Sequence, residues 1–185
     1  MTSGIIMDIF YPRIEEAMCM KMGDGVEQAI HSVAMLSGLS EGGVLSAAAL
    51  AEFHGVSTSY LLKHLQALSG AGILDTVPGP KGGYRLAKAP KEISLLDIVL
   101  AVEGSAPAFR CAEIRQRGPN PVSDRLFAQP CTINAAMLKA ERVYRAELAK
   151  TSLADIGIDL AAVDDGSIAA RGCAFLEIHE RKMAR

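Results

Sequence analysis

The stretch SAAALAEFHGVSTSYLLKHLQALSGAGILDTVPGPKGGYRLA, residues 46–87, decides the fold of this chain. Its first part, Ser46–Phe53, is rich in residues that favour helices, and His54-Gly55-Val56 predicts a tight turn after it. Ser57 is expected to cap a second helix that ends at about Gly70. Three leucines of this second helix have helical spacing and predict its buried face: Leu61, Leu65 and Leu68.

A hairpin is predicted directly after these two helices. Ile73–Val77 and Tyr84–Leu86 are rich in apolar and β-branched residues, and the Pro- and Gly-rich segment Pro78–Gly83 separates them. The expected fold is therefore mainly helical with a small β-wing, a winged helix-turn-helix. In such a fold one helix fits the major groove of DNA, and the hairpin reaches the backbone or the adjacent minor groove.

Composition limits the class of protein. The chain has 185 residues, of which 50% are hydrophobic, so it can bury a core. It has no run of about eighteen apolar residues and no N-terminal signal pattern, so we expect neither a membrane span nor export. Its four cysteines are then expected in a reducing cytoplasm, as metal ligands, redox groups or core residues rather than as a disulfide framework.

Charge is distributed unevenly along the chain. The formal net charge is −2, but residues 46–91 carry a surplus of positive charge, and the remainder is acidic. The charged residues of this segment are Lys63, Lys81, Arg85, Lys88 and Lys91 against Glu52 and Asp75. A basic module on an acidic body favours docking of that module on a phosphate backbone.

The chain is expected to divide into four segments: an N-terminal extension (1–21), the winged helix-turn-helix (22–104), a sensor loop with a dimerisation helix (105–155), and a C-terminal tail (156–185). Helices are predicted at 25–37, 94–104, 131–150 and, with weaker patterns, 151–163 and 167–183. The connection 105–130 contains four prolines, and a loop of this length is usually functional or mobile.

The helix predicted at 131–150 carries an apolar stripe formed by Ile133, Met137, Ala140, Tyr144 and Leu148. Such a stripe often packs only on the core of its own chain. In a small winged-helix protein, a long helix outside the DNA module is commonly where two subunits meet. We therefore expect a homodimer.

The predicted DNA contacts lie at the start of the second helix and in the wing. Hydroxyl and ammonium groups bind phosphates or base edges, and glycine amides in a turn can face a phosphate. An alternative is that Ser57 only caps its helix, that Tyr60 packs on the wing, and that Gly82 and Gly83 serve the geometry of the turn. The predicted contacts are Ser57, Thr58, Ser59, Tyr60, Lys63, Lys81, Gly82 and Gly83.

Four residues form a candidate metal or redox constellation. Glu27 and His31 are four residues apart and share one helix face, and Cys111 and Cys131 bracket the proline-rich loop. Thiolates and imidazoles bind iron–sulfur clusters or zinc. From spacing alone, the Glu/His pair could equally be a solvated helix face, and the cysteines could be small buried hydrophobes, because they lack the close spacing of a zinc site.

The run YLLKHLQALSGAGILDTVPGPKGGYRLAKAPKEISLLDIVLAVEG resembles the IscR/NsrR/RsrR family of winged-helix regulators, the Rrf family, over roughly residues 22–155. The resemblance implies a homodimer on a near-palindromic DNA operator, with the long helix at the subunit interface. Many members hold an iron–sulfur cluster on three closely spaced cysteines. This chain instead has Cys111 in FRCAEIRQRGP and the later Cys131, which looks like the RsrR-type branch.

In that branch a [2Fe–2S] cluster is held by two cysteines of one subunit and by a Glu and a His of the partner's first helix. Glu27 and His31 occupy the matching positions here. The chain departs from the pattern at Gln28, where an aromatic residue is expected, and at Pro78, where some members have an arginine. Cys19 and Cys173 match no ligand position.

The expected function is that of a cytoplasmic transcription regulator, not an enzyme, whose DNA affinity depends on the redox state of a [2Fe–2S] cluster. A neutral imidazole in place of a thiolate raises the reduction potential of such a cluster. One alternative is a family member without a cluster that senses by cysteine oxidation, a small ligand or a protein partner. A Cys/His enzyme and a winged helix that binds only protein are two further candidate functions, although no oxyanion hole or dinucleotide loop is apparent in the sequence.

Overall fold

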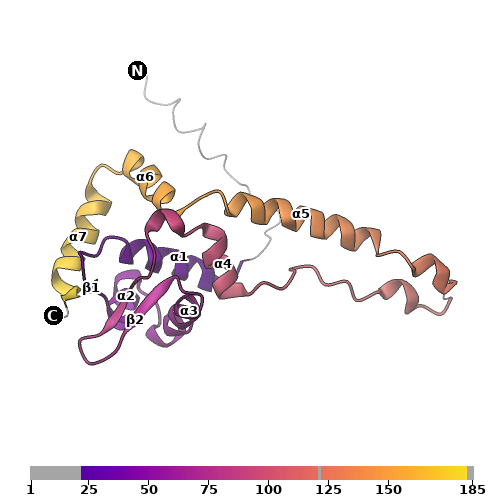
Figure 1. Cartoon of the computed structure of the whole chain (residues 1–185), viewed down its shortest axis with the longest axis horizontal. Helices are drawn as coiled ribbons and strands as arrows, with labels where there is room; N and C mark the ends of the chain where they lie inside the picture. The colour runs from indigo at the N-terminus through magenta and orange to yellow at the C-terminus, as the bar shows by residue number, and fades with distance from the viewer. Residues whose placement is uncertain (1–21, 121, 183–185) are drawn as a thin grey trace, which may run out of the picture.

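The computed structural model describes residues 22–120 and 122–182, which form a head and a projecting arm (Figure 1). The predicted N-terminal extension and Cys19 lie outside the described residues. The helices are α1 (Asp24–Leu36), α2 (Ala47–His54), α3 (Thr58–Gly70), α4 (Leu95–Glu103), α5 (Thr132–Leu148), α6 (Leu153–Val163) and α7 (Ser167–His179). The strands are β1 (Gly43–Val44), β2 (Leu74–Val77), β3 (Gly83–Leu86) and β4 (Arg181–Lys182), and the short 3-10 helices are η1 (Pro90–Glu92), η2 (Ile114–Gln116) and η3 (Asp124–Phe127).

The predicted helix-turn-helix and wing are confirmed. Ser46 caps α2 by accepting the backbone N–H of Ala49 at 3.1 Å, and Gly55 ends that helix in the left-handed conformation at φ 66°. Strands β2 and β3 pair antiparallel, in register from Leu74 opposite Leu86 to Val77 opposite Gly83. The fold class is therefore mainly helical with a two-stranded wing, as the sequence predicts.

The core of the head lies between α1, α2, α3 and α4. Its leucines and β-branched residues are fully or almost fully buried, and α1 packs against both α3 and α4. Gly25 allows the close approach of α1 and α3, because a Cβ at this position would collide with the ring of His64. The recognition helix α3 is thus held directly against α1.

The C-terminal part of the chain folds back onto the head. Ser94 and Ser152 cap α4 and α6 with matching capping boxes, and the N–H of Leu153 donates to the carbonyl of Ile93 at 2.8 Å. The side chains of Leu153 and Leu176 join the core of the head. The helix predicted at 167–183 ends earlier, at His179, because Arg181 and Lys182 extend to pair with β1. The four-segment division of the chain remains a prediction.

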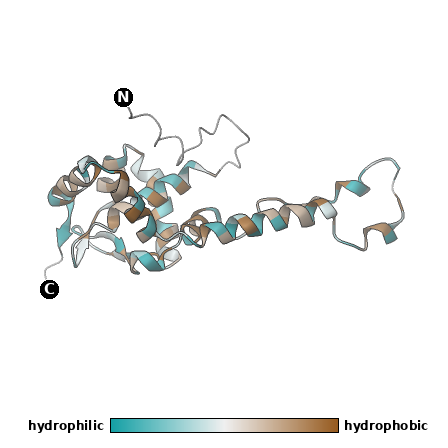
Figure 2. Ribbon diagram, turned by 90° about the horizontal axis from the view of Figure 1, so that it is seen from above, coloured by the Kyte–Doolittle hydropathy of each residue, from teal (hydrophilic) through white to brown (hydrophobic). Residues whose placement is uncertain are grey.

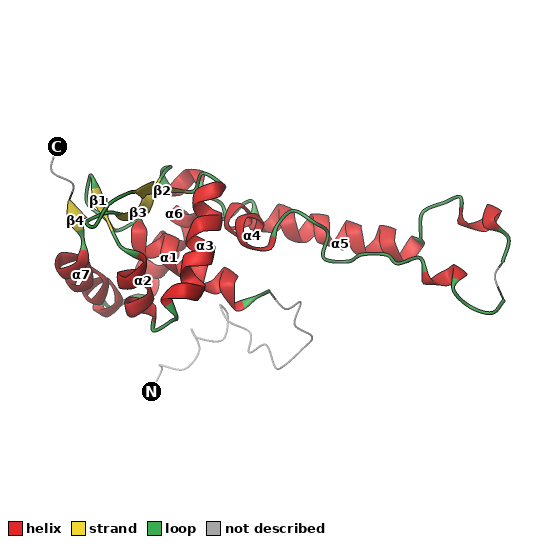
Figure 3. Ribbon diagram, turned by 90° about the horizontal axis from the view of Figure 1, so that it is seen from below, coloured by secondary structure: helices red, strands yellow, loops and turns green. Residues whose placement is uncertain are grey.

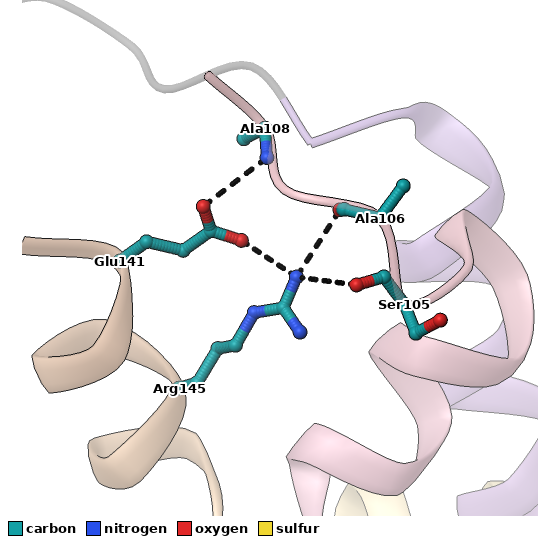
Figure 4. Close-up of polar contacts among 5 residues, drawn as sticks. All are labelled: Ser105, Ala106, Ala108, Glu141 and Arg145. Carbon is teal, nitrogen blue, oxygen red and sulfur yellow. Dashed lines mark hydrogen bonds and ion pairs between the residues drawn. The ribbon is translucent and has the colours of Figure 1, made fainter. Parts of the chain in front are cut away.

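The arm consists of α5 and the segment 105–130, which runs back along it (Figure 3). A polar cluster fastens the base of this segment to α5 (Figure 4). Arg145 donates to the carbonyls of Ser105 and Ala106, both at 3.2 Å, and to Glu141 at 2.6 Å. Glu141 in turn accepts the N–H of Ala108 at 3.2 Å. These bonds hold the first residues of the segment against the C-terminal half of α5.

Candidate functional site

One end of α3 presents the five polar residues predicted to contact DNA. Ser57, Thr58, Ser59, Tyr60 and Lys63 are all exposed, whereas the leucines on the opposite face of this helix are buried. Ser57 occupies the cap position, but its side chain makes no capping bond and instead lies 3.0 Å from the Ser59 hydroxyl. The ring of Tyr60 packs edge-on against His64, with centroids 4.7 Å apart. The Ser57 hydroxyl is therefore available to a ligand without loss of a helix cap.

In the wing turn Lys81 is exposed to solvent, whereas Gly82 and Gly83 lie where no side chain would fit. A Cβ at Gly82 would collide with the carbonyl of Val77, and one at Gly83 with that of Leu45. The N–H of Gly82 donates to the Gly79 carbonyl at 2.9 Å, so it is already used within the turn. Contact of Gly82 and Gly83 with DNA remains a prediction, and their geometric role is evident.

The two cysteines predicted as ligands meet at the far end of the arm. Cys131 is the N-cap residue of α5, it is buried, and its thiol forms a hydrogen bond with the side chain of Cys111, which is exposed. The backbone N–H of Asn134 is the main cause that lowers the pKa of the Cys131 thiol. The N–H of Ile133, the Cys111 side chain and the charge of Arg115 lower this pKa further, against the opposing effect of burial. This end of the arm therefore favours a thiolate.

The side chain of Arg115 lies in the loop between Cys111 and Cys131 and contacts residues of both halves of that loop. Its guanidinium lies 4.6 Å from the ring centre of Phe127 and forms an ion pair with Glu113. Glu113 has a left-handed φ of 49°, which costs free energy in a residue with a side chain. These contacts join the two sides of the loop between Cys111 and Cys131. The positive charge of Arg115 was not singled out in the sequence, although its place in FRCAEIRQRGP is a usable signal.

Glu27 and His31 lie on the exposed face of α1, whose other face is buried in the head. Both side chains line a groove of about 800 Å³ between α1, the end of α2, and the start of α7, where Ser167 and Arg171 also lie. Arg171 lies over the ring of Phe53 at 4.6 Å and donates to the Phe53 carbonyl at 3.2 Å. No pattern along the chain indicated that α7 forms a wall of this groove.

His54 connects the groove to the helix-turn-helix. It is the last residue of α2, and its ring forms a hydrogen bond with the backbone of His31. Its Nε2 is buried and, within the described part of the chain, has no hydrogen-bond partner. Burial lowers the pKa of His54, and the neighbouring His31 and Arg171 lower it further. The imidazole is therefore expected to be neutral at pH 7.

The structure thus gathers the four predicted ligands into two pairs and not into one site. The cysteine pair lies at the start of α5, and the Glu27/His31 pair lies on α1. Figure 1 shows α1 in the head and α5 in the arm. No group of three potential metal ligands occurs among residues 22–120 and 122–182 of a single chain. A four-ligand site would have to combine the two pairs from different subunits.

The family model for Rrf2, described as an iron-dependent transcriptional regulator, matches residues 22–158. The chain belongs to the Rrf2 family. It is a DNA-binding transcriptional regulator, and several relatives that match it are named as transcriptional regulators. YffB of Lactococcus lactis, a helix-turn-helix regulator by name, is 34% identical over 137 residues, which are 74% of this chain and 86% of YffB.

IscR of Photorhabdus laumondii is 38% identical to this Rrf2 regulator over 72 residues, 39% of this chain and 44% of IscR. Two solved structures share the fold. IscR of T. potens has a TM-score of 0.60 at 23% identity and covers 83% of this chain and 98% of its own. CymR of Bacillus subtilis, a global cysteine regulator, has a TM-score of 0.54 at 19% identity, over 75% and 96% of the two chains.

The family match ends at residue 158, so helix α7 and strand β4 of this Rrf2 regulator lie beyond it. None of the helices in the described ranges is long and apolar enough to cross a membrane.

Proposed function

We propose that this Rrf2 regulator is a homodimer whose operator affinity is set by a redox-responsive [2Fe–2S] cluster. Cys111 and Cys131 of one subunit would bind the cluster together with Glu27 and His31 of the partner subunit. The observation that carries the proposal is the contact between the two cysteine side chains at the end of an exposed arm, remote from the other two candidate ligands.

The donor set fits the group. Two soft thiolates, one imidazole and one carboxylate are ligand types that an iron–sulfur centre accepts. Ligands must be deprotonated to bind, and the start of α5 already lowers the pKa of Cys131. Glu27 and His31 are exposed and lie one helical turn apart, so both can turn toward an incoming arm. The groove beside them leaves room for that arm.

The surface of the arm supports a dimer. Ile133 is 63% exposed and Met137 is 42% exposed, and both belong to the apolar stripe of α5. Leu126, in the loop next to the helix, is 68% exposed. Figure 2 shows hydrophobic residues along this narrow projection. Apolar surface of this kind is stabilised when a second subunit covers it.

When bound, the cluster would supply a one-electron redox change. The protein's own residues would relay it, because α1 carries Glu27 and His31 and packs directly on the recognition helix α3. His54 adds a second connection, from the backbone of His31 to the turn that precedes α3. A shift of α1 would change the spacing of the two recognition helices of the dimer. A tenfold change in occupancy needs a difference of only about 1.4 kcal/mol between the two states.

The test is an anaerobic absorption spectrum of freshly purified protein with iron and sulfide assays. We expect red-brown protein with about two irons and two sulfides per site, and bleaching by dithionite. The variants Cys111→Ala and Cys131→Ala should be colourless and still folded, whereas Cys173→Ala, which removes an exposed thiol on α7, should retain the iron. Full iron content in either of the first two variants would contradict the proposed ligand set.

A second candidate function rests on the same contact. In a regulator without a cluster, the adjacent thiols of Cys111 and Cys131 could form a disulfide. Each thiol would lose one hydrogen, and a peroxide would be reduced to water. Colourless protein that gains this disulfide with peroxide, and loses DNA affinity with it, would favour this function over the cluster.

A further inference from the structure

We propose that the C-terminal strand β4 is a second phosphate-binding element beside the wing, with Arg181 and Lys182 contacting the DNA backbone next to Lys81. These residues lie beyond the part of the chain that the family model matches. The predicted DNA contacts did not include them, because the sequence suggested a continuous helix to residue 183. The proposal concerns the DNA-binding surface alone and does not depend on a cluster.

Strand β4 belongs to the same layer as the wing. Val44 of β1 pairs with Arg181, and Gly43 pairs with Lys182. The next residue, Leu45, exchanges backbone hydrogen bonds with Tyr84 of β3 at 3.0 and 2.7 Å. Figure 3 shows β4, β1, β3 and β2 side by side in this order.

Arg181 reaches the turn of the wing itself. Its Nη1 donates to the carbonyl of Pro80 at 3.1 Å, directly before Lys81. A guanidinium has five N–H donors, and this bond uses one of them, so the others remain available for a phosphate. The geometry therefore places an arginine beside the lysine that the sequence predicts as the phosphate contact of the wing.

The charge of this edge is not neutralised. Lys81, Arg181 and Lys182 are exposed, and none of the three forms an ion pair with a carboxylate of the described residues. By contrast Arg85, also in the wing, is paired with Asp75 at 3.2 Å. The nearest acidic residue in sequence, Glu180, turns its carboxylate to the hydroxyl of Ser40.

Glu180 also holds β4 in place. Its carboxylate bonds to Ser40 and lies against Gly43, where a Cβ would collide with it. Preorganised cations give up less conformational freedom on binding than cations on a free tail. A fixed strand with two unpaired cations at the edge of the wing is suited to the phosphates that flank the segment read by α3.

The experiment measures binding to a labelled duplex of arbitrary sequence, about 40 base pairs long so that both recognition helices of a dimer and the flanking β4 strands can contact it. Fluorescence anisotropy is followed between about 50 and 200 mM salt. The double variant Arg181→Ala/Lys182→Ala should lower the slope of log K against log salt by about two units for each bound subunit, and Lys81→Ala by about one. The affinity of the double variant at low salt should fall at least about tenfold.

Two controls separate charge from structure. Arg181→Lys/Lys182→Arg keeps both charges and should retain the slope of the unmodified protein. Lys139→Ala/Lys150→Ala removes two charges from α5 and the residues just after it, and should also leave the slope unchanged. An unchanged slope in Arg181→Ala/Lys182→Ala would overturn the proposal. Loss of affinity in both β4 double variants without a change in slope would also overturn it, because Arg181 would then only shape the wing.

Discussion

The head and the arm of this regulator differ in how they bury their apolar residues. In the head, Leu61, Leu65 and Leu68 of α3 are 0% exposed, and α1, α2 and α4 surround them. In the arm, α5 is four residues longer than α3 and contains no buried residue. Both helices are amphipathic in sequence, so the pattern of apolar residues alone does not say which helix packs within its own chain.

This difference indicates a division of roles. The head contains a complete core and can present the recognition helix and the wing by itself. The arm carries exposed apolar side chains at Leu126, Ile133 and Met137. This is the arrangement expected of a segment completed by a second subunit. The predictions below test this contrast, beginning with the largest expected effect.

Leu→Ala substitutions should have very different effects in the two regions. Leu65→Ala leaves a cavity in the head and should lower the free energy of unfolding by about 2–5 kcal/mol. Leu126→Ala removes the same atoms from a side chain that is 68% exposed in the arm and should change it by less than about 0.5 kcal/mol. Urea denaturation followed by circular dichroism measures both. Equal losses of unfolding free energy in the two variants would contradict the difference in burial between the head and the arm.

A charge on the apolar stripe of α5 should weaken self-association. Met137→Asp places a carboxylate in the proposed interface and should raise the dimer dissociation constant at least about 30-fold, which corresponds to about 2 kcal/mol. Lys139→Asp introduces the same group on the opposite face of α5 and should leave the constant within about threefold. Sedimentation over a range of concentrations measures both. Undiminished association of Met137→Asp would exclude this face from the interface.

Substitution of the serines that precede α2 and α3 should affect stability differently, because only Ser46 makes a capping bond. Ser46→Ala removes a capping bond of 3.1 Å and should lower the free energy of unfolding by about 1 kcal/mol. Ser57→Ala removes no cap and should change it by less than about 0.5 kcal/mol, while it weakens DNA binding. Chemical denaturation and anisotropy titrations on the same samples provide both values. A stability loss in Ser57→Ala equal to that in Ser46→Ala would show that it acts as a cap.

Thiol titration should detect the lowered pKa of Cys131 in the arm. In cluster-free protein the pKa of Cys131 lies below the ordinary value of about 8.5, so its thiolate forms at lower pH than that of an ordinary thiol. The pH dependence of alkylation by iodoacetamide, read by mass spectrometry, should therefore show an earlier inflection at Cys131. Arg115→Ala should move this inflection upward. An inflection at or above the ordinary value for a thiol would contradict this account of the arm.

The fold could be predicted largely from local signals. The helix starts at Ser46 and Ser94 and the turn at Gly55 follow from local residue types, and the structure confirms their positions. The wing followed from its turn residues in the same way. Ser57 was also expected to cap its helix, but its side chain makes no capping bond. The end of α7 and the strand β4 could not be predicted, because they depend on pairing with β1, more than a hundred residues earlier in the chain.

The residues of the candidate site could be predicted from the sequence, but their arrangement in space could not. The sequence identified Glu27, His31, Cys111 and Cys131, and the structure brings them together as two separate pairs, Cys111/Cys131 and Glu27/His31. The contributions of His54 and Arg171 depend on tertiary packing, which no spacing along the chain reveals. The assignment of all four ligands to a cluster remains a prediction.

The most direct measurement of the central claim is the iron content of a mixed dimer. One subunit carries Cys111→Ala/Cys131→Ala, the other carries Glu27→Ala/His31→Ala, and two different affinity tags select the heterodimer. Ligands shared between subunits predict about one cluster per heterodimer and none in either homodimer, because one complete site forms only in the mixture. A heterodimer without iron, when the unmodified dimer contains it, would contradict a site built between subunits.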